Sequence, residues 1–297
     1  QISHVASSLI NAAKNGKKVT VSIELRARFD EEANINYAEQ MQDEGVTMLF
    51  GVTGLKVHCK MCVIEREENE KLVRYGFIST GNFNESTAKI YTDFTLMTAN
   101  PKILKDVYKV FNFLEVNYKV NRYKHIITSP HYTKSRIFAL IDNEIENAKK
   151  GKPAYIKLKM NSISSYKMID KLYEASRAGV KIQMIIRGLC CLVPGVKGMS
   201  ENIEIISIID KFLEHTRLYI FSNQQNPNIY ISSADWMTRN IDNRVEVSCP
   251  IYDEDIKREL QHLYDICWND NSYRRNNNPK VRAQFDTYRY YLNNLEG

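Results

Sequence analysis

The segment Gly54–Met61 reads GLKVHCKM, and a related segment in the second half of the chain, Leu213–Ile220, reads LEHTRLYI. Each contains a histidine followed two residues later by a cation, namely His58 and Lys60 in the first and His215 and Arg217 in the second. The flanking apolar residues predict a β-strand through both segments, where side chains two residues apart point to the same face. We therefore expect each histidine and its cation to face one shared ligand such as a phosphate.

Both pairs belong to a longer repeat. A predicted strand that runs into an arginine precedes each pair, because Arg28 lies 30 residues before His58 and Arg187 lies 28 residues before His215. A polar turn follows each pair, at residues 79–84 in the first half and 232–236 in the second. Strands alternate with helical patterns in both halves, so we predict an α/β fold of two related units with mixed, mostly parallel sheets flanked by helices.

The chain of 297 residues suits two domains of ordinary size. Hydrophobic periodicity fades over residues 117–132, so we place the domain boundary there, with residues 1–124 in the first domain and 125–297 in the second. The patterns predict helices over 1–15, 31–44, 101–115, 135–148 and 166–178, and strands over 19–25, 46–50, 56–65, 72–79, 154–159 and 181–186.

Composition limits the class of protein. No apolar run is long enough to span a membrane, and residues 1–25 lack the order of a signal peptide. The six cysteines have no dense disulfide spacing, which favours a reducing cytoplasm, with peripheral membrane association left open. Cys59 and Cys62 form a CxxC, but no second pair follows, so we interpret them as small packing residues rather than as a zinc site. The net charge of +6 is by itself weak evidence for a polyanionic partner.

Histidine suits chemistry at phosphorus, because its neutral imidazole is nucleophilic near pH 7. Phosphoryl transfer then needs mainly positioning and cations around the moving group, which Lys60, Arg28, Arg187 and Arg217 could supply. A single histidine on a strand more often has a structural role, but two with matching cations favour shared phosphate chemistry. The chain has neither a GxxxxGK[ST] loop nor a GxGxxG lid.

Other residues allow two interpretations each. Gly81 and Asn82 follow a predicted strand and could donate hydrogen bonds to phosphate, or could form an ordinary turn. Asp93 and Asp235 could orient functional groups or cap local structure. The basic tail at 274–282 could contact a polyanion or serve as a solvated connector.

Four strings carry a resemblance to a known family. They are ELRARFDEEAN at 24–34, GLKVHCK at 54–60, STGNFN at 79–84 and SSADWMTRN at 232–240. Together they resemble bacterial polyphosphate kinases of the first type, over nearly the whole chain. The resemblance implies two tandem domains of phospholipase D-like fold, which are the C-terminal catalytic domains of that family, without its N-terminal and head domains. Because the chain also begins at Gln1 rather than at Met, we expect it to be a fragment.

The resemblance also implies roles for individual residues. His58 matches the phosphohistidine and His215 the second active-site histidine, while Tyr91, Arg187 and Arg244 match positions near ATP and its phosphates. From the residue patterns we add Lys60, Asn82 and Arg217 as phosphate-binding candidates. Arg28 matches a position associated with Mg²⁺. A guanidinium has no lone pair for a metal, so we expect Arg28 to hold phosphate oxygens that themselves bind the ion.

We thus predict a kinase that reversibly transfers the terminal phosphate of ATP to a growing inorganic polyphosphate chain through phosphorylated His58, with Mg²⁺ as cofactor. Its expected partners are ATP or ADP, polyphosphate, the missing domains of the same chain and a second copy in a homo-oligomer, with no nucleic acid. A further magnesium-associated arginine of the family would precede Gln1. We therefore expect this chain to hold the catalytic centre without being competent alone.

Two alternatives remain open. The first is a phospholipase D-like phosphodiesterase or nuclease, which usually has lysine in both copies and an aspartate five residues after it. Here Arg217 replaces the second lysine, and Glu65 and Ser222 occupy the later positions. The second is a non-catalytic module that binds polyanions.

Overall fold

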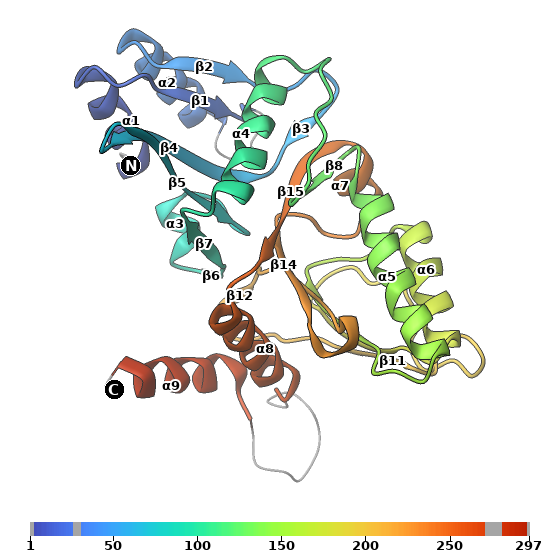
Figure 1. Ribbon diagram of the computed structural model, residues 1–297. Helices are drawn as coiled ribbons and strands as arrows, with labels where there is room; N and C mark the ends of the chain where they lie inside the picture. Colours follow the sequence, from blue (N-terminus) through green and yellow to red (C-terminus); the bar gives the residue numbers. More distant parts are fainter. Residues whose placement is uncertain (1–2, 26–30, 271–280, 296–297) are drawn as a thin grey trace.

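The computed structural model describes residues 3–25, 31–270 and 281–295, which form two α/β units joined end to end (Figure 1). Arg28 and most of the basic tail lie outside the described residues, so their predicted roles stay predictions. The first unit contains α1 (His4–Lys14), β1 (Thr20–Ile23), α2 (Glu31–Asp43), β2 (Thr47–Phe50), β3 (Lys56–Val57), β4 (Lys60–Glu68), β5 (Lys71–Ser79), α3 (Glu85–Ala88), β6 (Tyr91–Thr92), β7 (Thr95–Thr98) and α4 (Pro101–Glu115).

The second unit is built on one large sheet. Its elements are β8 (Ile127–Ser129), α5 (Thr133–Lys149), β9 (Tyr155–Met160), α6 (Tyr166–Arg177), β10 (Lys181–Ile186), β11 (Ile203–Ile206), β12 (Leu213–Glu214), β13 (Leu218–Phe221), η1 (Asn223–Gln225), β14 (Asn228–Ser232), α7 (Thr238–Asp242), β15 (Arg244–Ile251), α8 (Glu254–Trp268) and α9 (Ala283–Leu295). The sheet runs in the order β11-β10-β9-β13-β14-β15-β3, and β8 also pairs with β15.

Two apolar cores lie on opposite faces of this sheet. On β13, Tyr219 and Phe221 pack into a core with α5 and α6, whereas Leu218 and Ile220 pack into a core with α4 and α8. This alternation is the period of two expected for a strand buried on both faces. Because the second core includes α4 of the first unit, it also joins the two units.

Two short parallel pairs connect the units directly. The first joins β3 to β15, with Lys56 opposite Arg244 and Val57 opposite Val245. The second joins β6 to β12, with Leu213 opposite Tyr91 and Glu214 opposite Thr92. Each pair ends immediately before a histidine of the repeated motif. These two parallel pairs between the units therefore determine where both histidines lie.

The predicted helices and most strands are confirmed, and α4 and β10 have the predicted bounds. The prediction of one strand over 56–65 is wrong, because the chain leaves β15 at His58 and enters a separate sheet at Lys60. The backbone N–H groups of His58 and Cys59 both donate to the carbonyl of Val245 at 3.0 Å, where the strand breaks. His215 lies in a similar break between β12 and β13.

The predicted mixed α/β class is confirmed, but parallel pairing does not dominate. Parallel and antiparallel pairs are about equally frequent among the described strands. Part of the reason is local: short links connect β4 to β5 and β13 to β14, and such links can join only antiparallel neighbours. Within the described residues, no helix is both long and apolar enough to cross a membrane.

A buried carboxylate fastens the connection between the units. Asp106 in α4 is 2% exposed and accepts hydrogen bonds from the backbone N–H groups of Lys124 at 2.8 Å and His125 at 2.7 Å. Its other oxygen pairs with Lys109 at 2.8 Å. A single side chain thus satisfies two backbone donors and one cation at the point where the chain enters the second unit.

We predict that Asp106→Ala lowers the free energy of unfolding by about 3 kcal/mol, because it leaves two backbone donors and a lysine without their partner. Urea denaturation measures this change. Glu146→Ala is the matched control, because Glu146 and Lys149 form the same i,i+3 ion pair on an exposed helix face. Its effect should stay below about 0.5 kcal/mol. Equal effects of the two variants would contradict the proposed role of Asp106.

Candidate active site

His58 is held by a carboxylate of the other unit. Its Nδ1 lies 2.9 Å from each carboxylate oxygen of Glu246, which is 1% exposed on β15. Glu246 also accepts a hydrogen bond from the hydroxyl of Ser233 and one of 2.8 Å from Nδ2 of Asn240. With three donors around it, the carboxylate is fixed in orientation, and so is the imidazole that it binds.

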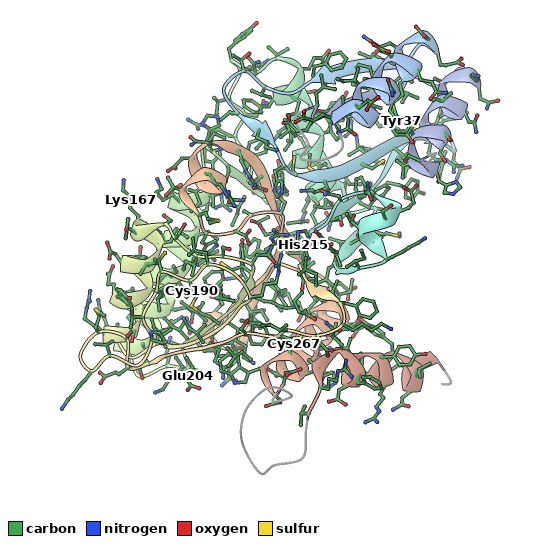
Figure 2. All side chains as sticks on the ribbon, turned by 180° about the vertical axis from the view of Figure 1, so that it is seen from behind. Tyr37, Lys167, Cys190, Glu204, His215 and Cys267 are labelled. Carbon is green, nitrogen blue, oxygen red and sulfur yellow. The ribbon has the colours of Figure 1, made fainter. Side chains whose placement is uncertain are left out.

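His215 is held in the converse way, by a carboxylate of the first unit. Its Nδ1 lies 2.9 and 3.0 Å from the two oxygens of Asp93, and Thr80 donates to that carboxylate at 2.6 Å. Gly81 is required here, because a Cβ at this position would lie 1.9 Å from Oδ2 of Asp93. The ring of Tyr91 packs on His215 with 4.9 Å between centroids. Figure 2 shows His215 where the two units meet.

The register of the two connecting strand pairs explains both contacts. Val57 lies opposite Val245, so the next residues along the two chains are His58 and Glu246. Glu214 lies opposite Thr92, so the next residues are His215 and Asp93. Parallel strands advance together, and each pair ends with an imidazole beside a carboxylate.

The carboxylates determine which imidazole nitrogen is available. A neutral imidazole whose Nδ1 donates to a carboxylate carries its proton there, which leaves Nε2 with a free lone pair. Nε2 of His58 has no hydrogen-bond partner in the described part of the chain. Nε2 of His215 lies 3.0 Å from the guanidinium Nη1 of Arg217. The two histidines are therefore chemically unequal, and His58 has the more accessible nucleophilic nitrogen.

Burial keeps both histidines neutral near pH 7. For His58, desolvation lowers the pKa below its ordinary 6.5, Glu246 opposes this, and Lys60 and Arg244 add to the lowering. For His215, burial again is the largest cause of a lowered pKa, opposed by Asp93. A neutral imidazole is the form that can attack phosphorus.

The cations two residues after the histidines contact the histidines' own backbone carbonyls, and Arg217 also contacts the ring of His215 as the shared face predicted. Lys60 donates its ammonium to the carbonyl of His58, and Arg217 donates to the carbonyl of His215 at 2.9 Å. Both cations are buried, and burial lowers the pKa of Lys60 to about 8. Arg217 also forms an ion pair with Asp235, with 3.2 Å between Nη2 and Oδ2. Each cation thus stabilises the strand break that carries its histidine.

Two half-buried arginines remain free of carboxylates. Arg187 follows β10 and donates its Nε to Oδ1 of Asn161 at 2.6 Å. Arg244 begins β15, two residues before Glu246. Neither forms an ion pair with a carboxylate in the described ranges. Burial lowers the pKa of both groups, but arginine stays cationic in proteins.

The remaining predicted residues divide between the site and its margin. Tyr91 lies at the site through its contact with His215, and Asn82 is exposed in the turn after Gly81. Sequence reasoning left Asp93 and Asp235 open between two roles, and the structure places them against His215 and Arg217. Sequence reasoning missed Glu246 altogether, although a carboxylate within the buried strand RVEVSCPI was a usable signal.

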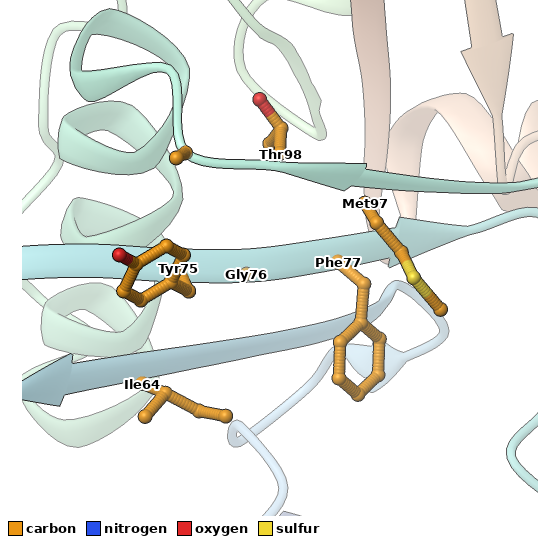
Figure 3. A pocket seen from close by; sticks show the side chains of 7 residues that line it. Ile64, Tyr75, Gly76, Phe77, Met97 and Thr98 are labelled. Carbon is orange, nitrogen blue, oxygen red and sulfur yellow. The ribbon is translucent and has the colours of Figure 1, made fainter.

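A cavity elsewhere is not part of this site. It has a volume of about 390 Å³ and lies on the β4–β5–β7 sheet, where Ile64, Tyr75, Phe77 and Met97 line it (Figure 3). Its lining contains no histidine, cation or carboxylate. It therefore lacks the groups that phosphate chemistry requires.

We predict that Asp93→Asn lowers the pKa of His215 further and leaves that of His58 unchanged, because Asp93 stabilises the protonated form of His215. Glu246→Gln should lower the pKa of His58 and leave that of His215 unchanged. NMR titration of the imidazole resonances measures both, and the chain has only six histidines. Each variant is the control for the other. If either substitution shifted both titrations, or neither, the crossed pairing would be contradicted.

Comparison with known proteins agrees with this geometry. A family model described as polyphosphate kinase C-terminal domain 1 matches residues 1–120, and one described as polyphosphate kinase C-terminal domain 2 matches residues 126–288. The polyphosphate kinase of Vibrio cholerae is 49% identical over 99% of the chain, and that of Escherichia coli K12 is 45% identical over 97%. The chain spans only 44% of the length of each of these curated relatives.

A solved structure matches as well. The crystal structure of polyphosphate kinase from Porphyromonas gingivalis superposes on the whole chain with a TM-score of 0.91 and 40% identity, and 47% of that protein is covered. Two tandem α/β domains that correspond to the C-terminal domains of the family, as the resemblance implied, are confirmed by this match and by the two family models. The chain belongs to the polyphosphate kinase family.

Proposed function

We propose that the protein containing this chain is an ATP-polyphosphate phosphotransferase. In this proposal, His58 accepts the terminal phosphoryl group of ATP and passes it to the end of an inorganic polyphosphate chain, and both steps are reversible. The observation that carries the proposal is the Glu246–His58 contact, which fixes the ring by Nδ1 and leaves Nε2 free in a site rich in cations. The names of the relatives support the same activity.

The proposed first step exchanges one bond to phosphorus for another. The lone pair on Nε2 of His58 forms the P–N bond, and the bond from the γ-phosphorus to the bridging oxygen breaks with its electron pair on ADP. The imidazole becomes cationic as the P–N bond forms, and Glu246 stabilises that charge through Nδ1–H. In the second step, a terminal oxygen of polyphosphate attacks the same phosphorus and releases the neutral imidazole.

The surrounding residues would supply charge and orientation. Arg187 and Arg244 suit the phosphate oxygens, because neither is neutralised by a described carboxylate. Tyr91 offers a ring beside His215, suited to a nucleotide. His215 would help to hold the leaving nucleotide. Lys60 and Arg217 would support the histidines through hydrogen bonds to their backbone carbonyls. Asn82 would donate a hydrogen bond to phosphate from its exposed turn.

Mg²⁺ fits this site as part of the substrate. No cluster of three or more His, Cys, Asp or Glu side chains suited to a metal occurs among the described residues. Phosphate oxygens are good Mg²⁺ ligands, so the ion would arrive bound to ATP. Arg28 would then act on those phosphates, as the sequence predicted.

We also propose that the catalytic domains divide at 124/125 and act within a longer cytoplasmic protein that forms homo-oligomers. The division follows from β8, which begins at Ile127 and already belongs to the large sheet. The relatives are more than twice as long as this chain, and such length leaves room for the missing domains.

Labelling with γ-³²P-ATP tests the proposal, in the longest natural chain that contains these residues. The parent protein should acquire acid-labile, base-stable phosphate, as expected for a P–N bond. His58→Ala should abolish this label, whereas His215→Ala should lose turnover but retain some label. Equal labelling of His58→Ala would overturn the assignment. Hydrolysis of a generic phosphodiester without ATP-dependent labelling would favour the phosphodiesterase alternative.

A further inference from the structure

Asn161 connects Arg187 to the rest of the site. It is 6% exposed, directly after β9, and its Oδ1 accepts the Nε–H of Arg187 at 2.6 Å. Its backbone N–H donates to Oδ1 of Asp235 at 2.8 Å, and its carbonyl accepts the N–H of Gly188 at 2.8 Å. Of these contacts, only the one with Arg187 uses the side chain. A substitution at 161 therefore tests that contact while the backbone bonds remain available.

The backbone around this contact is tightly packed. A Cβ at Gly188 would lie 2.9 Å from the carbonyl oxygen of Asn161 and 2.9 Å from the hydroxyl of Ser162. The residue after Arg187 thus lies directly against the segment that carries Asn161. This close approach leaves the arginine little freedom at its backbone, and the amide then fixes the guanidinium end.

Arg217 and Arg187 have hydrogen-bond partners of different charge. Arg217 is 3% exposed and pairs with the carboxylate of Asp235 through both Nε and Nη2, each at 3.2 Å. Its charge is already balanced inside the protein. Arg187 is held through Nε by a neutral amide and forms no ion pair with a described carboxylate, which leaves its two terminal nitrogens and its charge available for a ligand. A guanidinium presented in this way suits the two oxygens of a phosphate.

We propose that Asn161 is a positioning residue that orients Arg187 toward phosphate without neutralising it. The amide is essential because it accepts a hydrogen bond while carrying no charge. This inference rests on the proposed function to the extent that Arg187 meets a phosphate group. It predicts that aspartate, which has the same shape and the same acceptor, is a worse residue at 161 than alanine.

The test measures binding of inorganic tripolyphosphate by calorimetry from about 50 to 200 mM salt, in the longest natural chain that contains these residues. Arg187→Ala should weaken binding about tenfold and make log K less dependent on log salt, because one cation no longer releases a counterion. Asn161→Asp should reproduce both effects by neutralising Arg187. Asn161→Ala should weaken binding only about threefold, with the salt dependence of the parent, because orientation is lost but the charge remains.

Asn202→Asp is the matched control. Oδ1 of Asn202 accepts from Nζ of Lys181 at 2.6 Å, so the pair has the same amide-to-cation distance as Asn161 and Arg187 but involves an exposed contact of the lysine at the opposite end of β10. This variant should bind tripolyphosphate like the parent. Thermal unfolding of all variants checks that each is folded.

The outcomes distinguish a failure of the proposed function from a failure of the role proposed for Asn161. If Arg187→Ala binds like the parent, Arg187 does not meet phosphate and both this inference and that part of the proposed function fail. If Arg187→Ala weakens binding but Asn161→Asp binds at least as tightly as Asn161→Ala, only the role of the neutral amide fails. Should Asn161→Asp not fold, Asn161→Ala still decides, because parental affinity in that variant would overturn the inference.

Discussion

The crossed pairing of imidazole and carboxylate is the interaction on which the whole site depends. Glu246 of the second unit holds His58 of the first, and Asp93 of the first unit holds His215 of the second. Neither unit can orient its own histidine, so the site exists only when both are folded and joined. The contacts between the units, including the core shared by α4 and α8, therefore hold the candidate site together as well as stabilising the fold.

The register of two short strand pairs is enough to place each histidine beside its carboxylate. Two parallel pairs, each two residues long, bring the chains to the point where an imidazole and a carboxylate come next. Such short pairs would be marginal alone. They are supported by buried contacts behind the site, where Glu214 accepts hydrogen bonds from Lys159, from Thr92 and from Gln284 of α9. Glu214 thereby joins both units and the last helix immediately before His215.

Local patterns in the sequence predicted α1, α2, α4, α5 and α6, several strands, the repeat and both histidine motifs, because each of these leaves a signal within a few residues, whereas α8 was missed. They could not predict the break at His58, since the apolar residues on both sides have the same period whether one strand or two are present. The pairing of Glu246 with His58 could not be predicted for another reason: the two residues lie 188 positions apart, and periodicity carries no information over that distance. Asp93 was recognised as a candidate, but the sequence left it open between orienting a functional group and capping local structure.

The two halves of the repeat differ in how the charges of their cations are balanced. This difference separates the proposed roles of the two histidines. In the second half, Arg217 is balanced by Asp235 and also contacts Nε2 of His215, so both the cation and the nitrogen are already engaged. In the first half, Nε2 of His58 has no such donor in the described residues. A nucleophile needs a free lone pair, and a phosphate needs unbalanced cations nearby. Both conditions are met at His58 and not at His215, which supports the proposal that the duplicated motif forms one reactive centre, with the second histidine as its assistant.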